Sequence, residues 1–208
     1  MKKIFLLIIP FILSVSCNTH VSSQVVVYNN DFETGNLANI TNGVITPFNG
    51  SAVLGRYNKG NFALALNNLP AHDMITISFD LYIHDTWWGN STAPLGPDIW
   101  QMKVDGNTYI NTTFSNYPCA AGNFCPPQSY PASYPNSYND PKTGAYRTDL
   151  PGACIMANTP NWTTQYKIVQ TFKHSNSTLL LQCLDQLPET MCDQSWSVDN
   201  INIQAIKL

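Results

Sequence analysis

Charged residues are scarce in this chain of 208 residues. Lysine and arginine together number 10 and aspartate and glutamate 13, so that only 11% of the residues are charged and the formal net charge is −3. Proteins that bind nucleic acid neutralise its phosphates with clustered cations, and the sequence contains no such cluster. We therefore exclude nucleic acid as a partner.

Enzyme motifs are missing as well. The chain has no Gly-x-Ser-x-Gly elbow and no glycine-rich phosphate loop. It has only two glutamates, Glu33 and Glu189, and its cysteines form no Cys-x-x-Cys pair of the kind that binds zinc. These absences favour a binding protein over an enzyme. The alternative is a glycoside hydrolase whose two carboxylates come together by folding, for instance Asp80 and Asp98.

The single long apolar run lies at the N-terminus. Lys2 and Lys3 precede the apolar residues 4–15, and small residues follow, which is the layout of a secretory signal peptide. We expect the signal peptide to comprise residues 1–16, with an end as late as residue 23 as the alternative.

One domain should follow at residues 24–208. No later apolar stretch approaches 18 residues, so we expect the mature protein to have no transmembrane span. It is then secreted, or attached to the cell surface. Attachment to the cell surface is suggested by Ser14-Val15-Ser16-Cys17, which loosely resembles a lipobox and would place a lipid anchor on Cys17.

Six cysteines in an exported chain predict disulfides. Cys119 with Cys125 and Cys183 with Cys192 are the pairs that close short loops. Cys154 then pairs with Cys17 or stays free.

Polarity comes mainly from asparagine, serine and threonine. Six Asn-x-Ser/Thr sequons predict a glycoprotein if the host is a eukaryote. They begin at Asn39, Asn49, Asn90, Asn111, Asn161 and Asn176.

Strand patterns dominate, and helix patterns are nearly absent. In residues 74–84 apolar and polar residues alternate strictly, which predicts a strand with one buried face. Asp105-Gly106 and Asn49-Gly50 are dipeptides typical of tight hairpin turns. Further strands are expected at residues 24–28, 62–66, 99–104, 108–114, 165–173, 178–183 and 195–206. Short strands separated by glycine, proline and asparagine predict an all-β, antiparallel β-sandwich.

Residues 117–160 break this pattern. The segment is rich in proline, tyrosine, serine and asparagine, and it holds three of the six cysteines. A long irregular stretch inside a compact domain is usually functional or disordered. The cysteines favour an ordered, disulfide-stapled loop at one end or across one face of the sandwich.

Two motifs carry a resemblance to known extracellular modules. Asp31-Phe32-Glu33-Thr34-Gly35 resembles the opening of many jelly-roll modules, where acidic residues lie near a structural calcium. Ser195-Trp196-Ser197-Val198-Asp199-Asn200-Ile201 resembles the final strand of concanavalin-like, reelin-repeat-like and galactose-binding-like sandwiches. With the weaker matches between them, the resemblance covers residues 31–203 and implies a jelly-roll β-sandwich with no established activity. The chain departs from the pattern at Ser197, where glycine is usual.

Acidic residues provide two candidate calcium sites, because calcium takes six to eight oxygen ligands. Asp31 and Glu33 near the start could meet Asp199 near the end, since first and last strands often pair in jelly rolls. Asp80, Asp85 and Asp98 form a second, weaker candidate.

Aromatic residues provide a candidate glycan surface, because flat rings stack on the apolar faces of sugars. Trp87 and Trp88 lie in a loop, and we expect one of them to pack into the core. Tyr130 and Tyr134 lie in the 117–160 loop. We therefore predict a glycan-binding or cell-adhesion module with a possible structural calcium. The alternative is a structural surface or matrix glycoprotein that contacts other proteins through this loop.

Overall fold

The computed structural model describes residues 20–119, 122 and 124–208. The predicted signal peptide at 1–16 and Cys17 lie outside these residues. The described part contains twelve strands and no helix, and so no helix that could cross a membrane. The strands are β1 (Ser23–Asn30), β2 (Ile40–Thr41), β3 (Ile45–Phe48), β4 (Ser51–Tyr57), β5 (Asn61–Leu66), β6 (Met74–Asp85), β7 (Ile99–Val104), β8 (Asn107–Thr113), β9 (Arg147–Leu150), β10 (Thr163–Lys173), β11 (Leu179–Gln186) and β12 (Gln194–Lys207).

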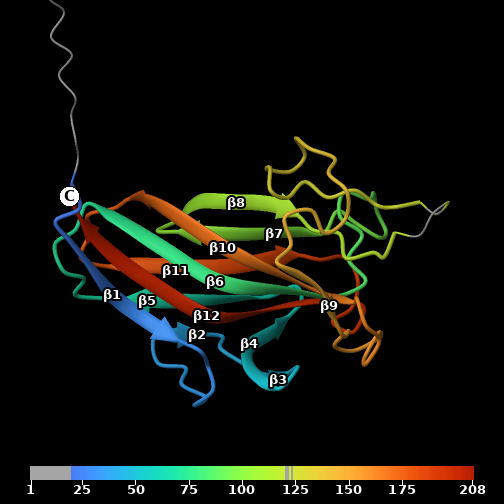
Figure 1. The fold of residues 1–208 in the computed structure, drawn as a ribbon, viewed down its shortest axis with the longest axis horizontal. Coiled ribbons are helices and arrows are strands. Elements are labelled where there is room, and N and C mark those ends of the chain that lie inside the picture. The colour runs from blue at the N-terminus through green and yellow to red at the C-terminus, as the bar shows by residue number, and fades with distance from the viewer. Residues whose placement is uncertain (1–19, 120–121, 123) are drawn as a thin grey trace, which may run out of the picture.

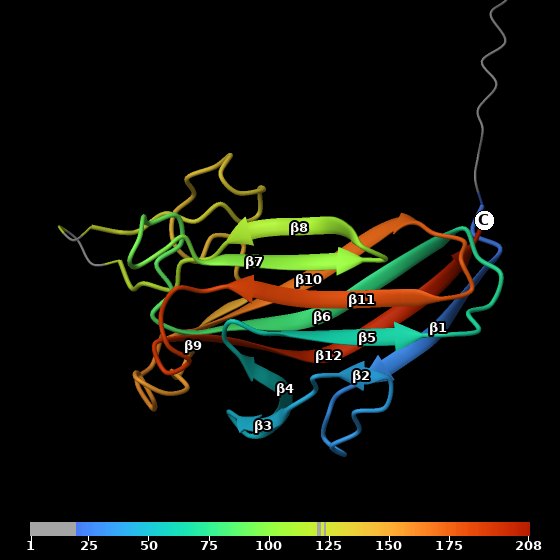
Figure 2. The same cartoon turned by 180° about the vertical axis from the view of Figure 1, so that it is seen from behind.

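The strands form two antiparallel sheets. The seven-stranded sheet has the order β3-β4-β12-β6-β10-β9, with β1 also paired to β12, and the five-stranded sheet has the order β2-β5-β11-β7-β8 (Figures 1 and 2). The chain alternates between the sheets from β4 to β7 and again from β10 to β12. This is the jelly-roll sandwich that the sequence predicts. The predicted pairing of the first and last strands is also present.

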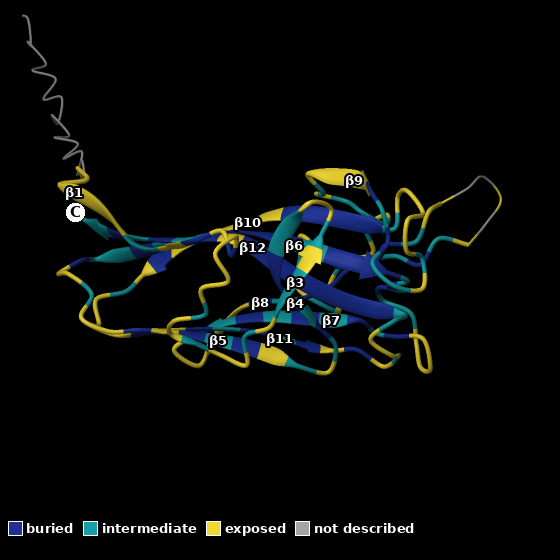
Figure 3. Ribbon diagram, turned by 90° about the horizontal axis from the view of Figure 1, so that it is seen from below, coloured by how far each residue is buried: buried dark blue, intermediate teal, exposed yellow. Residues whose placement is uncertain are grey.

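The core lies between the two sheets (Figure 3). Along β6 the apolar residues point inward and are buried, whereas their polar neighbours point to the outer face, as period-two alternation requires. The largest core side chains are Trp87, Trp100 and Trp196. Trp196 lies at the centre, with its ring centroid 5.9 Å from that of Trp100 across the sandwich.

Two hairpins form at the dipeptides that predict them. Asp105-Gly106 joins β7 to β8, and Asn49-Gly50 joins β3 to β4, with positive φ at all four residues, as such turns require. The strand β4 crosses β12 closely at Gly55. A Cβ atom on Gly55 would lie 2.6 Å from the Cβ of Ser197, and the register of the two strands shifts there. The small residues on both strands therefore allow this close approach.

The 117–160 segment lies at the end of the sandwich away from the C-terminus (Figures 1 and 2). Its centre is anchored by Gln128, which is fully buried. The Gln128 backbone pairs with Asn139, and its side-chain amide donates to the carbonyl oxygen of Thr143 at 3.0 Å. The described part of the segment is thus an ordered structure with internal hydrogen bonds, as its cysteines predict.

Candidate functional site

The outer face of the seven-stranded sheet carries a patterned set of polar and aromatic side chains. Strand register places three residues of β6 between partners on β10 and β12. Asp80 lies between Lys167 and Asp199, Tyr82 between Gln165 and Ser197, and His84 between Thr163 and Ser195. Residues paired across antiparallel strands share a face. This face therefore brings together side chains from distant parts of the chain.

An aromatic cluster occupies the middle of this face. Phe48, at the end of β3, packs its ring 4.6 Å from the His84 ring and 5.6 Å from the Tyr82 ring, measured between centroids. Burial, with a smaller effect of the nearby Arg56 charge, lowers the pKa of His84 to about 3, so this imidazole is neutral at physiological pH. Neutral His84 bonds to the hydroxyls of Thr163 and Ser197 at 3.0 and 2.7 Å. His84 is a structural support beneath the cluster.

The hydroxyl of Tyr82 is available to a ligand. Among the described residues, none forms a hydrogen bond with it. Burial, together with the negative charges of Asp80 and Asp199, raises the pKa of Tyr82, so that the hydroxyl keeps its proton and can donate. Tyr82 thus combines a half-buried ring with an unengaged polar atom.

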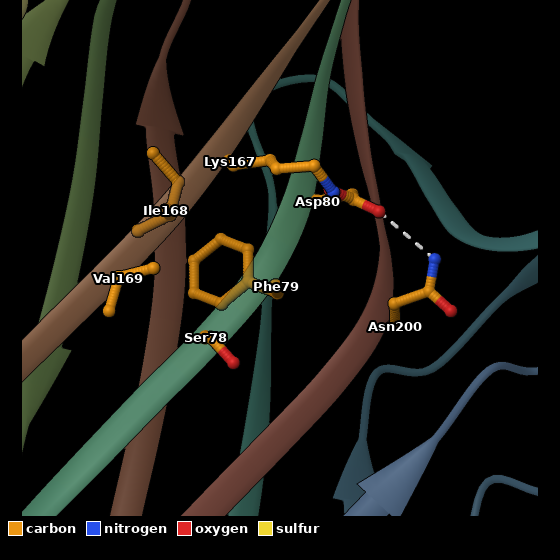
Figure 4. Close-up of a pocket in the computed structure, with 7 residues that line it drawn as sticks. All are labelled: Ser78, Phe79, Asp80, Lys167, Ile168, Val169 and Asn200. Carbon is orange, nitrogen blue, oxygen red and sulfur yellow. Dashed lines mark hydrogen bonds and ion pairs between the residues drawn. The ribbon is translucent and has the colours of Figure 1, made fainter. Parts of the chain in front are cut away.

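Two charged residues of this face, Asp80 on β6 and Lys167 on β10, lie close together (Figure 4). Asp80, Lys167 and Asn200 line a pocket of about 230 Å³. Lys167 Nζ lies 3.0 Å from Asp80 Oδ1, and the Asn200 amide donates to Asp80 Oδ2 at 3.0 Å. Arg56, on β4, lines a second pocket together with Phe48. We call the row formed by Arg56, Phe48, Tyr82, Asp80 and Lys167 the outer strip.

The first predicted calcium site is assembled only in part. The Ser51 hydroxyl bonds to a Glu33 carboxylate oxygen and lies 3.4 Å from Asp199 Oδ2, so these two acidic residues are neighbours. Asp31 instead accepts a hydrogen bond from the Glu33 amide at 3.2 Å and faces solvent. Within the described residues no three His, Cys, Asp or Glu side chains form a group that could hold a metal ion. The prediction that Asp31, Glu33 and Asp199 form one cluster was therefore wrong, because Asp31 belongs to a local turn.

The second acidic candidate, Asp80, Asp85 and Asp98, is not a cluster either. Asp85 accepts hydrogen bonds from the amides of Ala153, Cys154 and Met156. Asp98 is fully buried and accepts from the Trp88 and Gly89 amides, so it organises the loop after β6. Each aspartate serves a different segment, and the structure does not bring Asp80 and Asp98 together as a hydrolytic pair.

The predicted aromatic surface is largely packed. Trp87 is fully buried and donates its indole N–H to the Ser195 carbonyl at 3.0 Å, so its assignment as a ligand-binding residue was wrong. Trp88 is half-buried and donates to Glu189, which confirms that one ring enters the core and the other does not. Tyr130 packs against Phe114, with ring centroids 4.9 Å apart.

Tyr134 is half-buried, and its backbone amide donates to Asn111. Its role as a ligand contact stays a prediction. The face residues Phe48, Tyr82 and Arg56 did not stand out in the sequence. The signal that could have found one of them is Tyr82 itself, an aromatic residue at a polar position of the alternating strand at 74–84.

Cysteine pairing agrees with the prediction for one bond and differs for the other. Cys119 pairs with Cys125 as predicted, but Cys192 pairs with Cys154 and not with Cys183. Cys183 is a free, fully buried thiol in β11, where its side chain points into the core. A disulfide from Cys183 to Cys192 was therefore a wrong prediction, because Cys183 is buried in the core whereas Cys192 lies in the turn before β12 and meets Cys154 there.

The sequons differ in accessibility. Asn39, Asn49, Asn161 and Asn176 are exposed, and Asn111 is half-buried. The Asn90 amide donates to the Ser137 carbonyl at 2.8 Å, so a glycan on Asn90 would replace a hydrogen bond that holds the 117–160 segment. Glycosylation at the six positions stays a prediction.

The environment of Asp199 predicts a pH dependence of stability. Burial, reinforced by the charges of Asp80 and Glu33 and opposed by a hydrogen bond from the Asn200 amide, raises the pKa of Asp199 to about 6. A carboxyl with a higher pKa in the folded chain binds its proton more tightly when folded. Stability should therefore fall as the pH rises from about 4 to about 6.

The variant Asp199→Asn should remove this decline and unfold at a higher urea concentration than the wild type at pH 8. Urea midpoints at several pH values measure it, with Asp140→Asn, at an exposed loop position, as the control. An unchanged pH profile in Asp199→Asn would show that Asp199 titrates normally.

Comparison with known proteins returns only distant structural likeness. No family model and no curated protein matches the chain. A family 35 carbohydrate-binding module from Clostridium thermocellum aligns with a TM-score of 0.39 and 14% identity, covering 88% of this chain and 98% of the module. The C-terminal CBM6 of LamC, a marine laminarinase from Zobellia galactanivorans, aligns with a TM-score of 0.37 and 10% identity, covering 87% and 98%. At these values the likeness says nothing about which ligand this chain binds.

Proposed function

We propose that this protein is a secreted, non-catalytic glycan-binding module whose binding site is the outer strip. The observation that carries the proposal is the cluster of Phe48 and Tyr82 between charged groups of both signs. Sugar sites in proteins combine aromatic rings with a few polar groups that set orientation. The strip supplies both on one sheet face.

The geometry favours a ligand longer than one sugar. Pockets lie at both ends of the strip, one lined by Asp80 and Lys167 and the other by Phe48 and Arg56. Tyr82 lies between them, since its ring contacts Phe48 and its strand neighbour two residues earlier is Asp80. A polymer lying along the strip would contact both pockets and pass over the Tyr82 ring.

Replacement of Tyr82 tests the proposal. Tyr82→Ala removes the ring and the free hydroxyl, and we expect the dissociation constant for a bound oligosaccharide to rise about tenfold or more. Tyr82→Phe keeps the ring and should weaken binding less. A glycan array on the wild type selects the ligand, and titration calorimetry measures the variants.

Tyr138→Ala is the matched control, because Tyr138 is 76% exposed in the 117–160 segment that first suggested aromatic binding. If Tyr138→Ala loses affinity and Tyr82→Ala does not, the binding site lies in that segment and the outer strip is wrong. Absence of any glycan ligand on the array, with calcium supplied, would refute the function itself.

A second candidate function is a surface or matrix protein that contacts other proteins. The exposure of Phe124 and Tyr138, 74% and 76%, favours it. Deleting the whole loop is a poor test because Gln128 and Tyr130 pack inside the domain. The double variant Phe124→Ser with Tyr138→Ser leaves those contacts intact, and loss of self-association or matrix binding would support this function.

Secretion, calcium binding and glycosylation belong to the same proposal, and a lipid anchor at Cys17 is the alternative to free secretion. The two disulfides support export, because such bonds persist in oxidising compartments. For calcium, the support is the neighbouring pair of Glu33 and Asp199. Intact mass of the mature protein reports cleavage, lipid and sugar together, and a calcium-dependent rise in melting temperature that Asp199→Asn abolishes would support the metal.

A further inference from the structure

A larger cavity lies at the Arg56 end of the outer strip. It has a volume of about 500 Å³, which is within the usual range for small-ligand sites. The β3–β4 hairpin forms one side through residues 46–49 and Arg56. The turn at residues 151–158 forms the other side.

Two hydrogen-bond donors that line this cavity have no partner. Among the described residues, five buried side-chain atoms lack a hydrogen bond, and two of them are Arg56 Nη1 and Thr46 Oγ1. Buried polar groups in folded proteins are normally satisfied, and these two lack a partner within the described residues, so a group bound in the cavity could supply one. A guanidinium N–H and a hydroxyl both donate, and the group that would satisfy them is an acceptor with negative charge.

The nearest carboxylate does not fill this role. Asp85 Oδ2 lies 3.9 Å from Arg56 Nη1, which is beyond hydrogen-bond distance. The Asp85 carboxylate already accepts from the amides of Ala153, Cys154 and Met156. His84 is neutral, as described above, and competes for no anion. The guanidinium is thus partly compensated in charge, and its Nη1 stays an unpaired donor within the cavity wall.

The cavity wall is held in place before any ligand binds. Asp85 and the Cys154–Cys192 disulfide both fix the turn at residues 151–158. The backbone of Gly152 packs so closely on Met156 that an added Cβ would lie 2.4 Å from the Met156 carbonyl oxygen. Binding therefore needs little ordering of this wall, which favours affinity.

We propose that this cavity binds the acidic group of a negatively charged glycan, either a carboxylate or a sulfate ester, through Arg56 and Thr46. This rests on the proposed function and specifies its ligand as an acidic polysaccharide. Arginine presents a planar fork of N–H donors that matches both groups. The Phe48 ring, which also lines the cavity, offers an apolar surface to the sugar that carries the acidic group.

Binding measurements with three probes test this assignment. Titration calorimetry with oligogalacturonate, a sulfated galactan oligosaccharide and a neutral cello-oligosaccharide should show that one or both acidic probes bind and that the neutral probe binds at least about tenfold more weakly. The stronger acidic probe identifies the group as carboxylate or sulfate. Equal affinity for the neutral probe would overturn the acidic ligand while leaving glycan binding intact.

Three variants locate the site. Arg56→Gln should raise the dissociation constant for the acidic probe about tenfold or more, whereas Lys103→Gln, which removes the same charge from β7 in the other sheet, should leave it unchanged. Thr46→Val removes an unpartnered hydroxyl and should weaken acidic binding without lowering stability. Wild-type affinity in Arg56→Gln, an equal loss in Lys103→Gln, or unaltered binding in a folded Thr46→Val would each refute the site.

The two proposals fail in different ways. If Tyr82→Ala binds the acidic oligosaccharide as tightly as wild type while Arg56→Gln does not bind it, the cavity is an acid-sugar site on its own and the rest of the outer strip does not bind glycan. If Tyr82→Ala loses binding and Arg56→Gln retains it, the strip stands and the cavity assignment is wrong.

Discussion

Replacing Trp196 with alanine is expected to lower the free energy of unfolding by about 4 kcal/mol or more, the typical cost of removing a buried tryptophan ring. Trp196 is fully buried at the centre of the sandwich. Its ring centroid lies 4.8 Å from that of Tyr57 and 5.9 Å from that of Trp100. Its indole N–H also donates to Asp185 Oδ2 at 2.8 Å. Urea unfolding followed by circular dichroism measures the loss.

Trp196→Phe separates packing from the hydrogen bond. It keeps an aromatic ring in the core but leaves the Asp185 carboxylate without the indole donor, and we expect a loss of about 1–3 kcal/mol. Asp185 keeps its hydrogen bonds from the amides of Lys59 and Leu187, which should limit the loss of stability. A Trp196→Ala protein whose free energy of unfolding lies within about 1 kcal/mol of the wild-type value would contradict the role of this ring in packing the core.

Loss of the Cys154–Cys192 disulfide should lower the free energy of unfolding by nearly as much as Trp196→Ala does. The bond joins residues 38 apart in the sequence, and the chain-entropy relation for a loop of this size gives about 4 kcal/mol. The double variant Cys154→Ser with Cys192→Ser should therefore unfold at a clearly lower urea concentration. The two variants in one chain avoid a free thiol that could exchange with Cys183.

The second disulfide provides the control. Cys119 and Cys125 are only 6 residues apart, so the same relation gives a smaller cost of about 2 kcal/mol for removing their bond. Peptide mapping of the wild type reports the pairing directly. A Cys183–Cys192 peptide, or a double variant as stable as the wild type, would contradict the structure.

The strands that could be predicted from the sequence are those with a clear local pattern. β6 was predicted with an end only one residue from the observed one because its alternation is strict, and β7 matches over its full length. The structure adds β2, β3, β4 and β9. Three of these have two to four residues, and the buried face of β4 is interrupted at Gly55, where the strand crosses Ser197. Short or irregular strands lack the alternation by which such elements are recognised.

At the candidate site, local sequence patterns do not predict which side chains come together. Asp31 and Glu33 lie close to each other in sequence, and yet only Glu33 lies near Asp199, because the turn directs the Asp31 carboxylate to the backbone amide of Glu33. That one ring of Trp87 and Trp88 enters the core could be predicted from the alternation of side chains along an extended chain. Which of the two is buried depends on the segments that pack around them.

The sequence by itself determined the all-β class, the antiparallel sandwich and the positions of the tight turns, since period two and glycine at positive φ are local properties of the chain. Only the tertiary structure decided that Cys154 meets Cys192 and that Phe48, Arg56 and Tyr82 share one face. Alternation tells which side of its strand a residue occupies. Its neighbours there come from strands far away in the sequence, and the register between those strands is set by packing over the whole sandwich.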